Sequence, residues 1–174
     1  DSTHCKCYRV SSDRLKAETN YDLFKHIMFH YEDWDTLGNY QALSQSINKE
    51  TIVFYGTSLG SGVAVQLAQT KEPSLLILDA PFNSILEMAQ NTVRFVPIKL
   101  LMKDRYQSGL ALYDKTIPLI WIHGTEDTVV PISQGGKLFE NYKGPKSAHV
   151  IQGGQHTNLW PLGGRNIVLD ALEN

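Results

Sequence analysis

Three residues that lie far apart in the sequence could together perform nucleophilic chemistry: Ser58, Asp127 and His156. A serine hydroxyl is a weak nucleophile at neutral pH, so it needs a base within hydrogen-bond reach and an acid that orients the base. Each residue follows a segment that we expect to be a strand, in the order Ser, Asp, His. Because the carboxyl ends of parallel strands meet at one edge of a sheet, the order predicts a Ser-His-Asp catalytic triad.

The serine lies in the pattern Gly-Thr-Ser-Leu-Gly at residues 56–60. A β-prone apolar run, 51–55, precedes it, and a segment rich in small residues follows. A sharp strand-to-helix turn crowds the positions two before and two after its apex, which favours glycine there. The helix N-terminus also favours negative charge. The pattern is typical of a nucleophile elbow, and a glycine-rich turn with a surface serine is the alternative that this context disfavours.

The acid has several candidates. Asp127 lies in a turn-rich loop after the predicted strand 117–122, and its alternative role is to cap or turn the chain before the next helix. Glu126 is a rival, although adjacent residues on a loop rarely point the same way. Asp79, also at a strand end, is an alternative acid. We favour Asp127 because its loop is longer and richer in turn residues.

The base also has a competitor. His156 follows Gly153 and Gly154, which suits a loop whose backbone must approach a site closely, although a surface histidine is the alternative. His123 lies at the end of a predicted strand and precedes Asp127, so we expect it to pack and to shape the acid loop. In combination with Ser58, His156 is the better base.

The elements that must position these residues alternate between strand and helix. The chain has 174 residues, which suits a single domain over 1–174, with an irregular segment at 1–20. Apolar periodicity and punctuation by Gly and Pro predict strands at 51–55, 75–78, 117–122 and 148–151, helices at 22–34, 60–70, 84–91, 132–142 and 164–172, and a helical turn at 40–47. The alternation predicts the α/β class, with a mostly parallel sheet flanked by helices.

The composition of the chain bears on its partners and on its location in the cell. Hydrophobic residues make up 42% and charged residues 20%, with a net charge of −2, which is ordinary for a globular protein and gives no footprint for nucleic acid. The sequence holds no apolar run long enough to span a membrane and no signal-peptide pattern. We therefore expect a cytoplasmic location, while membrane association through a segment upstream of residue 1 stays open.

The two cysteines, Cys5 and Cys7, lie beside His4. Their spacing is not that of a usual zinc pair, and no second ligand pair follows, so we expect free thiols and no metal site.

Four segments now carry a resemblance to a family: 52–62, 78–82, 122–131 and 153–156. From Tyr21 to Asn174 the chain resembles the α/β-hydrolase superfamily, in the branch of serine aminopeptidase-like and lysophospholipase-like hydrolases without a large cap. The resemblance implies Ser58 as nucleophile, Asp127 as acid, His156 as base and the backbone N–H of Leu59 as an oxyanion donor. It also implies a small-molecule acyl substrate and no metal or organic cofactor.

The chain departs from that family before Ser58. The family has several strands there and a loop, usually of His-Gly type, that supplies the second oxyanion donor, and we find no such loop. Tyr8 and Arg9 resemble the remnant of a Tyr-Arg-Gly motif that ends the preceding strand. We therefore expect an N-terminally incomplete fold without its opening strands. The strand before Ser58 would then lie exposed at the edge of the sheet. We expect either that the chain is a fragment, or that this strand pairs with a second copy or a partner chain.

Two hypotheses about function follow. The first is a serine hydrolase that cleaves a carboxylic ester, thioester or amide through an acyl-enzyme, with acyl transfer left open. The second is a catalytically impaired or inactive hydrolase-like fragment, or an interaction module, that lacks part of the oxyanion hole. The substrate is not predicted. Residues near 82–105 are expected to shape its pocket. The apolar stretch 95–102 could line an acyl pocket or cover the sheet, and we favour the second because apolar helix faces usually pack.

Overall fold

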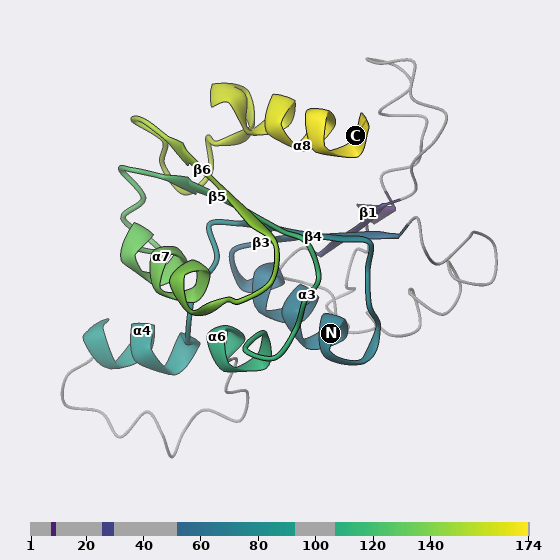
Figure 1. Cartoon of the computed structure of the whole chain (residues 1–174). Helices are drawn as coiled ribbons and strands as arrows, with labels where there is room; N and C mark the ends of the chain where they lie inside the picture. Colours follow the sequence, from purple (N-terminus) through teal and green to yellow (C-terminus); the bar gives the residue numbers. More distant parts are fainter. Residues whose placement is uncertain (1–7, 10–25, 30–51, 93–106, 174) are drawn as a thin grey trace, which may run out of the picture.

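The computed structural model describes residues 8–9, 26–29, 52–92 and 107–173. Its strands are β1 (Tyr8–Arg9), β2 (His26–Phe29), β3 (Val53–Thr57), β4 (Leu75–Asp79), β5 (Leu119–Gly124) and β6 (Lys146–Ile151). Its helices are α3 (Leu59–Thr70), α4 (Ile85–Thr92), α6 (Ser108–Ala111), α7 (Ile132–Asn141), the π-helix η2 (Trp160–Gly164) and α8 (Arg165–Glu173). Figure 1 shows a central sheet with α8 over one face and α3, α6 and α7 over the other.

The strands lie in the sheet in the same order as in the chain, from β1 to β6. Neighbours from β2 to β6 are parallel, and β1 is antiparallel to β2. The register pairs Thr57 with Asp79, Asp79 with Ile122, and Gly124 with Ile151. The carboxyl ends of β3 to β6 therefore lie side by side at one edge of the sheet, as Ser58, Asp127 and His156 require.

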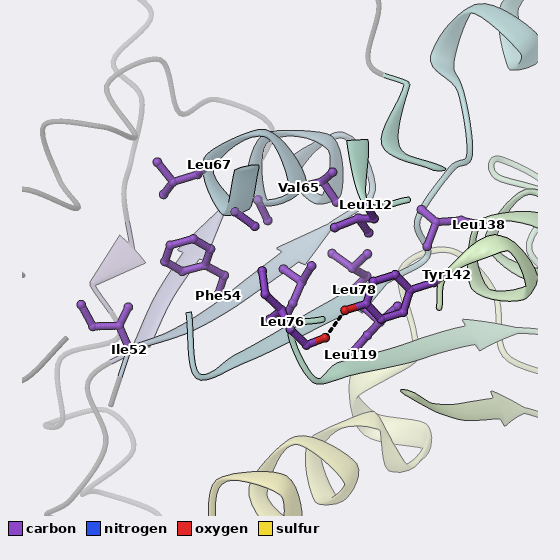
Figure 2. Packing of buried hydrophobic residues seen from close by; sticks show 13 residues of the cluster. Ile52, Phe54, Val65, Leu67, Leu76, Leu78, Leu112, Leu119, Leu138 and Tyr142 are labelled. Carbon is purple, nitrogen blue, oxygen red and sulfur yellow. Dashed lines mark hydrogen bonds between the residues drawn. The ribbon is translucent and has the colours of Figure 1, made fainter. Parts of the chain in front are cut away.

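Both faces of the central strands are buried. Because successive side chains of a strand point to opposite faces, each strand contributes residues to two separate clusters. One cluster of buried residues lies between the sheet and α3, and it contains Phe54, Leu76, Leu78, Leu138 and Tyr142 (Figure 2). The Tyr142 hydroxyl donates to the carbonyl oxygen of Ile117, which ties the end of α7 to the approach to β5. The other face packs against α8, where Val53, Tyr55, Ile77 and Ile122 join Val168 and Leu172. Burial on both faces explains the continuous apolar runs of these strands.

The predicted α/β class is confirmed, as are the strands and helices predicted between residues 51 and 172, within a few residues at their ends. The short helices α6 and η2 were not predicted from the sequence. The predictions for 40–47 and 95–102, and for residues 1–20 apart from β1, lie outside the described residues.

The helix predicted at 22–34 is wrong where the structure describes it, because His26–Phe29 forms β2. Periodic apolar residues in a short stretch do not distinguish a helix from a strand. Here pairing with β3 supplies the backbone hydrogen bonds that a helix would otherwise make.

The expected exposed edge at the elbow strand is also wrong. β3 pairs with β2 on one side and with β4 on the other, and Tyr8–Arg9 itself forms β1. Strands therefore do precede β3. The exposed edge that motivated pairing with a second chain is not present at β3.

Close contact between β3 and α3 depends on Gly56, which has no side chain. A Cβ atom placed on Gly56 would lie 2.6 Å from the carbonyl oxygen of Gly60 and 2.7 Å from the Cα of Ser61. Both are backbone atoms, which cannot turn aside as a flexible side chain would. Glycine at this position lets the helix start directly behind the strand and lets α3 lie close to the sheet.

We predict that Gly56→Ala lowers the free energy of unfolding by about 1–3 kcal/mol, because the added methyl group overpacks this contact. Gly136→Ala is the matched control. Its Cβ would meet only the Trp121 ring, at an ordinary 3.7 Å, and alanine favours the interior of α7. Urea denaturation measures both. Equal unfolding midpoints for Gly56→Ala and the unmodified protein would contradict the close-contact account.

Candidate active site

Ser58 occupies the turn between β3 and α3 in a backbone conformation that L-residues rarely adopt. Its φ is 53° and its ψ is −121°. Its N–H donates to the carbonyl oxygen of Asp79 at 2.9 Å, and its own carbonyl oxygen accepts from the N–H and the hydroxyl of Ser61, at 3.0 and 2.6 Å. Strained residues persist where surrounding contacts over-determine them. These bonds, on both sides of the residue, hold the Ser58 hydroxyl at the edge of the sheet.

The structure brings the three residues singled out in the sequence into one line. The Nε2 atom of His156 lies 2.9 Å from the Ser58 Oγ, and its Nδ1 lies 2.8 Å from the Asp127 Oδ2. The Asp127 side chain is fully buried, and that of His156 is 15% exposed. An ionised carboxylate can only accept, so Nδ1 carries the proton and Nε2 presents its lone pair to the hydroxyl. Such an imidazole can take the hydroxyl proton.

Asp127 makes two kinds of contact, one with the backbone of its own loop and one with His156. Its Oδ1 accepts the backbone N–H groups of Val129 and Val130, at 2.9 and 2.8 Å, which closes an Asx-type turn before α7. Its Oδ2 accepts from His156. Because the turn fixes the carboxyl group in place, it also fixes the direction in which the second oxygen points.

The loops that carry Asp127 and His156 are tied together. The Thr125 N–H donates to the Ile151 carbonyl oxygen at 3.1 Å, and the Glu126 N–H donates to the Gly154 carbonyl oxygen at 2.8 Å. A Cβ atom on Gly124 would lie only 2.1 Å from that same Gly154 oxygen. Gly153 has a φ of 68°, which favours glycine. The glycines therefore let the two loops meet. The rival Glu126 is exposed and has no hydrogen bond to His156.

His123 packs behind the acid loop, as expected. It is fully buried. The Trp121 indole N–H donates to its Nδ1 at 3.1 Å, so Nε2 carries the proton and donates to the Val130 carbonyl oxygen at 2.9 Å. Burial lowers the pKa of His123, against the opposing effect of the bond to Val130. A neutral His123 therefore supports the same turn that Asp127 closes.

Asp79, the alternative acid, makes no hydrogen bond to His156; its only side-chain bond within the described residues is to Tyr55. The Tyr55 hydroxyl donates to its Oδ2 at 2.6 Å, and its buried Oδ1 has no partner. Burial raises the pKa of Asp79 to about 6, while the Tyr55 bond and the charge of His156 lower it and the charge of Asp127 raises it. Sequence reasoning missed the Tyr55–Asp79 pair. Its only sequence signal is a tyrosine three residues before Ser58.

One groove in the described part of the structure lies apart from the line of Ser58, His156 and Asp127. A groove of about 490 Å³ between α3 and α6 is lined by other residues, among them Val65, Gln69 and Ser108.

The described residues contain no cluster of three or more His, Cys, Asp and Glu side chains suited to a metal ion, and Cys5 and Cys7 lie outside them. None of the described helices is both long and apolar enough to span a membrane.

Comparison with known sequences places this geometry in context. No protein-family model matches the chain. An uncharacterized protein of Mycobacterium tuberculosis is 32% identical over 126 residues, which are 72% of this chain and 44% of that protein. Human alpha/beta hydrolase domain-containing protein 17B is 30% identical over 113 residues, which are 65% of this chain and 38% of that protein. The matched region therefore spans less than half of either relative.

Solved structures share the fold at low sequence identity. An acetyl xylan esterase from Paenibacillus sp. R4 superposes with a TM-score of 0.63 at 17% identity, over 78% of this chain and 48% of the esterase. A monoacylglycerol lipase from Paleococcus ferrophilus superposes with a TM-score of 0.58 at 15% identity, over 78% of this chain and 73% of the lipase. At such identities the likeness concerns the fold.

Proposed function

Since the chain belongs to the α/β-hydrolase superfamily, we propose that it is a serine hydrolase. It cleaves a carboxylic ester, a thioester or an amide through an acyl-enzyme intermediate. The observation that carries the proposal is the continuous line from the Ser58 Oγ through both ring nitrogens of His156 to the buried carboxyl of Asp127. Sequence order and fold support it.

In this mechanism Ser58 attacks the substrate carbonyl while His156 takes the hydroxyl proton on Nε2. His156 then delivers that proton to the leaving group, and in the second half of the reaction it activates a water that hydrolyses the acyl-enzyme. Asp127 keeps the proton on Nδ1 and offsets the positive charge of the imidazolium. Its two backbone bonds leave Oδ2 free for that task.

The developing oxyanion is assigned to the N-terminus of α3. Leu59 is the first residue of that helix, so its N–H has no acceptor within the helix and can donate to the oxyanion. The second donor stays unassigned. If it is missing, the rate falls by a factor of roughly 10²–10³, which is the impaired alternative.

Neither a metal nor an organic cofactor has a part in this mechanism, and the proposed partner is a small-molecule acyl substrate. A cytoplasmic location, and assembly with a second copy or a partner chain, stay predictions from the sequence.

We predict that the native protein reacts with a fluorophosphonate probe at Ser58 and that Ser58→Ala does not. The phosphonate forms a stable bond only with an activated hydroxyl, so labelling reports the nucleophile without requiring a known substrate. Gel fluorescence after labelling measures the reaction. An unlabelled native protein, or equal labelling of Ser58→Ala, would contradict the proposal. Labelling without turnover of p-nitrophenyl acetate or butyrate would favour the impaired alternative.

We also predict that Asp127→Asn separates the two roles of that residue. The amide oxygen still accepts from Val129 and Val130, so the free energy of unfolding stays within about 1 kcal/mol. The amide nitrogen then faces His156 and favours the wrong imidazole tautomer, so turnover falls by about 10³–10⁴-fold. Urea denaturation and p-nitrophenyl butyrate hydrolysis measure the two effects. Glu126→Gln, an exposed neighbour, is the control and keeps full turnover. A turnover of Asp127→Asn above one-tenth of the control would contradict the assignment of the acid.

A further inference from the structure

We propose that Asp79 is a positioning residue of this site, a second carboxylate whose negative charge stabilises the imidazolium form of His156, with the Tyr55 hydroxyl bound to that carboxylate. The inference rests on the proposed hydrolase function. Asp79 does not touch the reacting atoms in this account, and it acts only through His156.

The place of Asp79 in the sheet brings its charge to the site. It ends β4 and is the register partner of Thr57, next to Ser58. Its own carbonyl oxygen accepts the Ser58 N–H at 2.9 Å, so its backbone position is fixed relative to the turn. The residue is only 7% exposed. Water therefore screens this charge far less than it would screen a surface carboxylate.

The carboxyl group is only half satisfied. Its Oδ2 accepts the Tyr55 hydroxyl at 2.6 Å, whereas its buried Oδ1 has no hydrogen-bond partner among the described residues. A buried acceptor that lacks a protein partner costs free energy. No Lys or Arg forms an ion pair with Asp79 in the described part of the chain. Among the described side chains, Asp79 is bonded only to the neutral hydroxyl of Tyr55, which offsets little of the carboxylate charge.

The titratable groups that act on Asp79 come from three neighbouring elements. They are Tyr55 on β3, Asp127 on the loop after β5 and His156 on the loop after β6. The positive charge of His156 favours the ionised form of Asp79. Asp79 and His156 both lie beside Ser58, because the Asp79 carbonyl oxygen accepts the Ser58 N–H and the Nε2 of His156 lies 2.9 Å from the Ser58 Oγ. A buried negative charge stabilises a positive charge that forms nearby, and a positive charge forms on the imidazole when His156 takes the serine proton.

Tyr55 is built to serve as a fixed, neutral donor. Burial and the Asp79 charge raise its pKa well above the ordinary value, so the phenol keeps its proton. Its ring also packs edge-on against Trp160, with the ring centroids 6.2 Å apart. Because its hydrogen bond stabilises the charged form of Asp79, Tyr55 extends the ionised state of that carboxyl to lower pH.

The kcat/KM of the hydrolase should fall at acid pH as Asp79 takes a proton. Burial raises the pKa of Asp79 to about 6, so the carboxyl is ionised above that pH and takes a proton below it. When Asp79 is neutral, His156 loses the support of that charge. The fall of kcat/KM on the acid side therefore contains the titration of Asp79, and changes at Asp79 and Tyr55 move this acid limb in opposite directions.

The test is the pH profile of kcat/KM for p-nitrophenyl butyrate between pH 4.5 and 9, with Asp79→Asn, Tyr55→Phe and Glu126→Gln compared with the unmodified protein. Asp79→Asn removes the charge at every pH. We expect its plateau to fall about tenfold and its acid limb to move down by about half a pH unit or more. Tyr55→Phe removes the bond that favours the ionised form. We expect its limb to move up by about half a pH unit, with a plateau within about threefold of the unmodified protein.

Glu126→Gln also converts an acid to an amide, next to Asp127 in the sequence, but the exposed charge of Glu126 is screened, so the pH profile of this variant should not move. Unfolding curves confirm that each variant is folded, and if Asp79→Asn does not fold, Tyr55→Phe alone decides. Limbs that stay in place, or that move in the same direction in both variants, overturn the inference while leaving the hydrolase intact. An unmodified protein with no Ser58-dependent turnover means instead that the underlying function has failed.

Discussion

Parallel pairing of β3, β4, β5 and β6 is the constraint on which the rest of the structure depends. It places the carboxyl ends of four strands at one edge, so that Ser58 and His156, 98 residues apart in the sequence, lie within hydrogen-bond distance. The strained Ser58 follows β3, and the buried carboxyl of Asp79 ends β4. The Asx-type turn of Asp127 follows β5, and the loop of His156, which begins with two glycines, follows β6. The chemistry therefore depends on sheet register before it depends on any side-chain contact.

Two kinds of local detail turn that register into a site. Glycines at positions 56, 124 and 154 let backbone segments approach more closely than a Cβ atom would allow. Hydrogen bonds then fix what the close approach permits, as when Asp127 closes its turn with one oxygen and faces His156 with the other. Because the turn aims the second oxygen, stability and proposed catalysis use the same residue without conflict.

The sequence was sufficient to predict the α/β class and to predict that Ser58, Asp127 and His156 lie together, because strand ends and glycine-rich turns leave strong local patterns. It was insufficient for features that depend on tertiary context. Residues 26–29 have an apolar pattern that fits either a helix or a strand, and they form a strand because their backbone pairs with β3. The hydrogen bond from Tyr55 to Asp79 joins residues 24 apart, and it exists only because β3 and β4 are neighbours in register. The roles of the three site residues stay proposals.

The central claim is that Ser58 carries the acyl group during turnover. The most direct measurement is to mix the protein with p-nitrophenyl butyrate, quench it in acid within the first turnover, and locate the added mass by peptide mass spectrometry. The account predicts a butyryl group on the peptide that contains Ser58, formed as p-nitrophenol is released and lost as hydrolysis proceeds. A butyryl group on a different residue, or p-nitrophenol release without any acylated peptide, would contradict it.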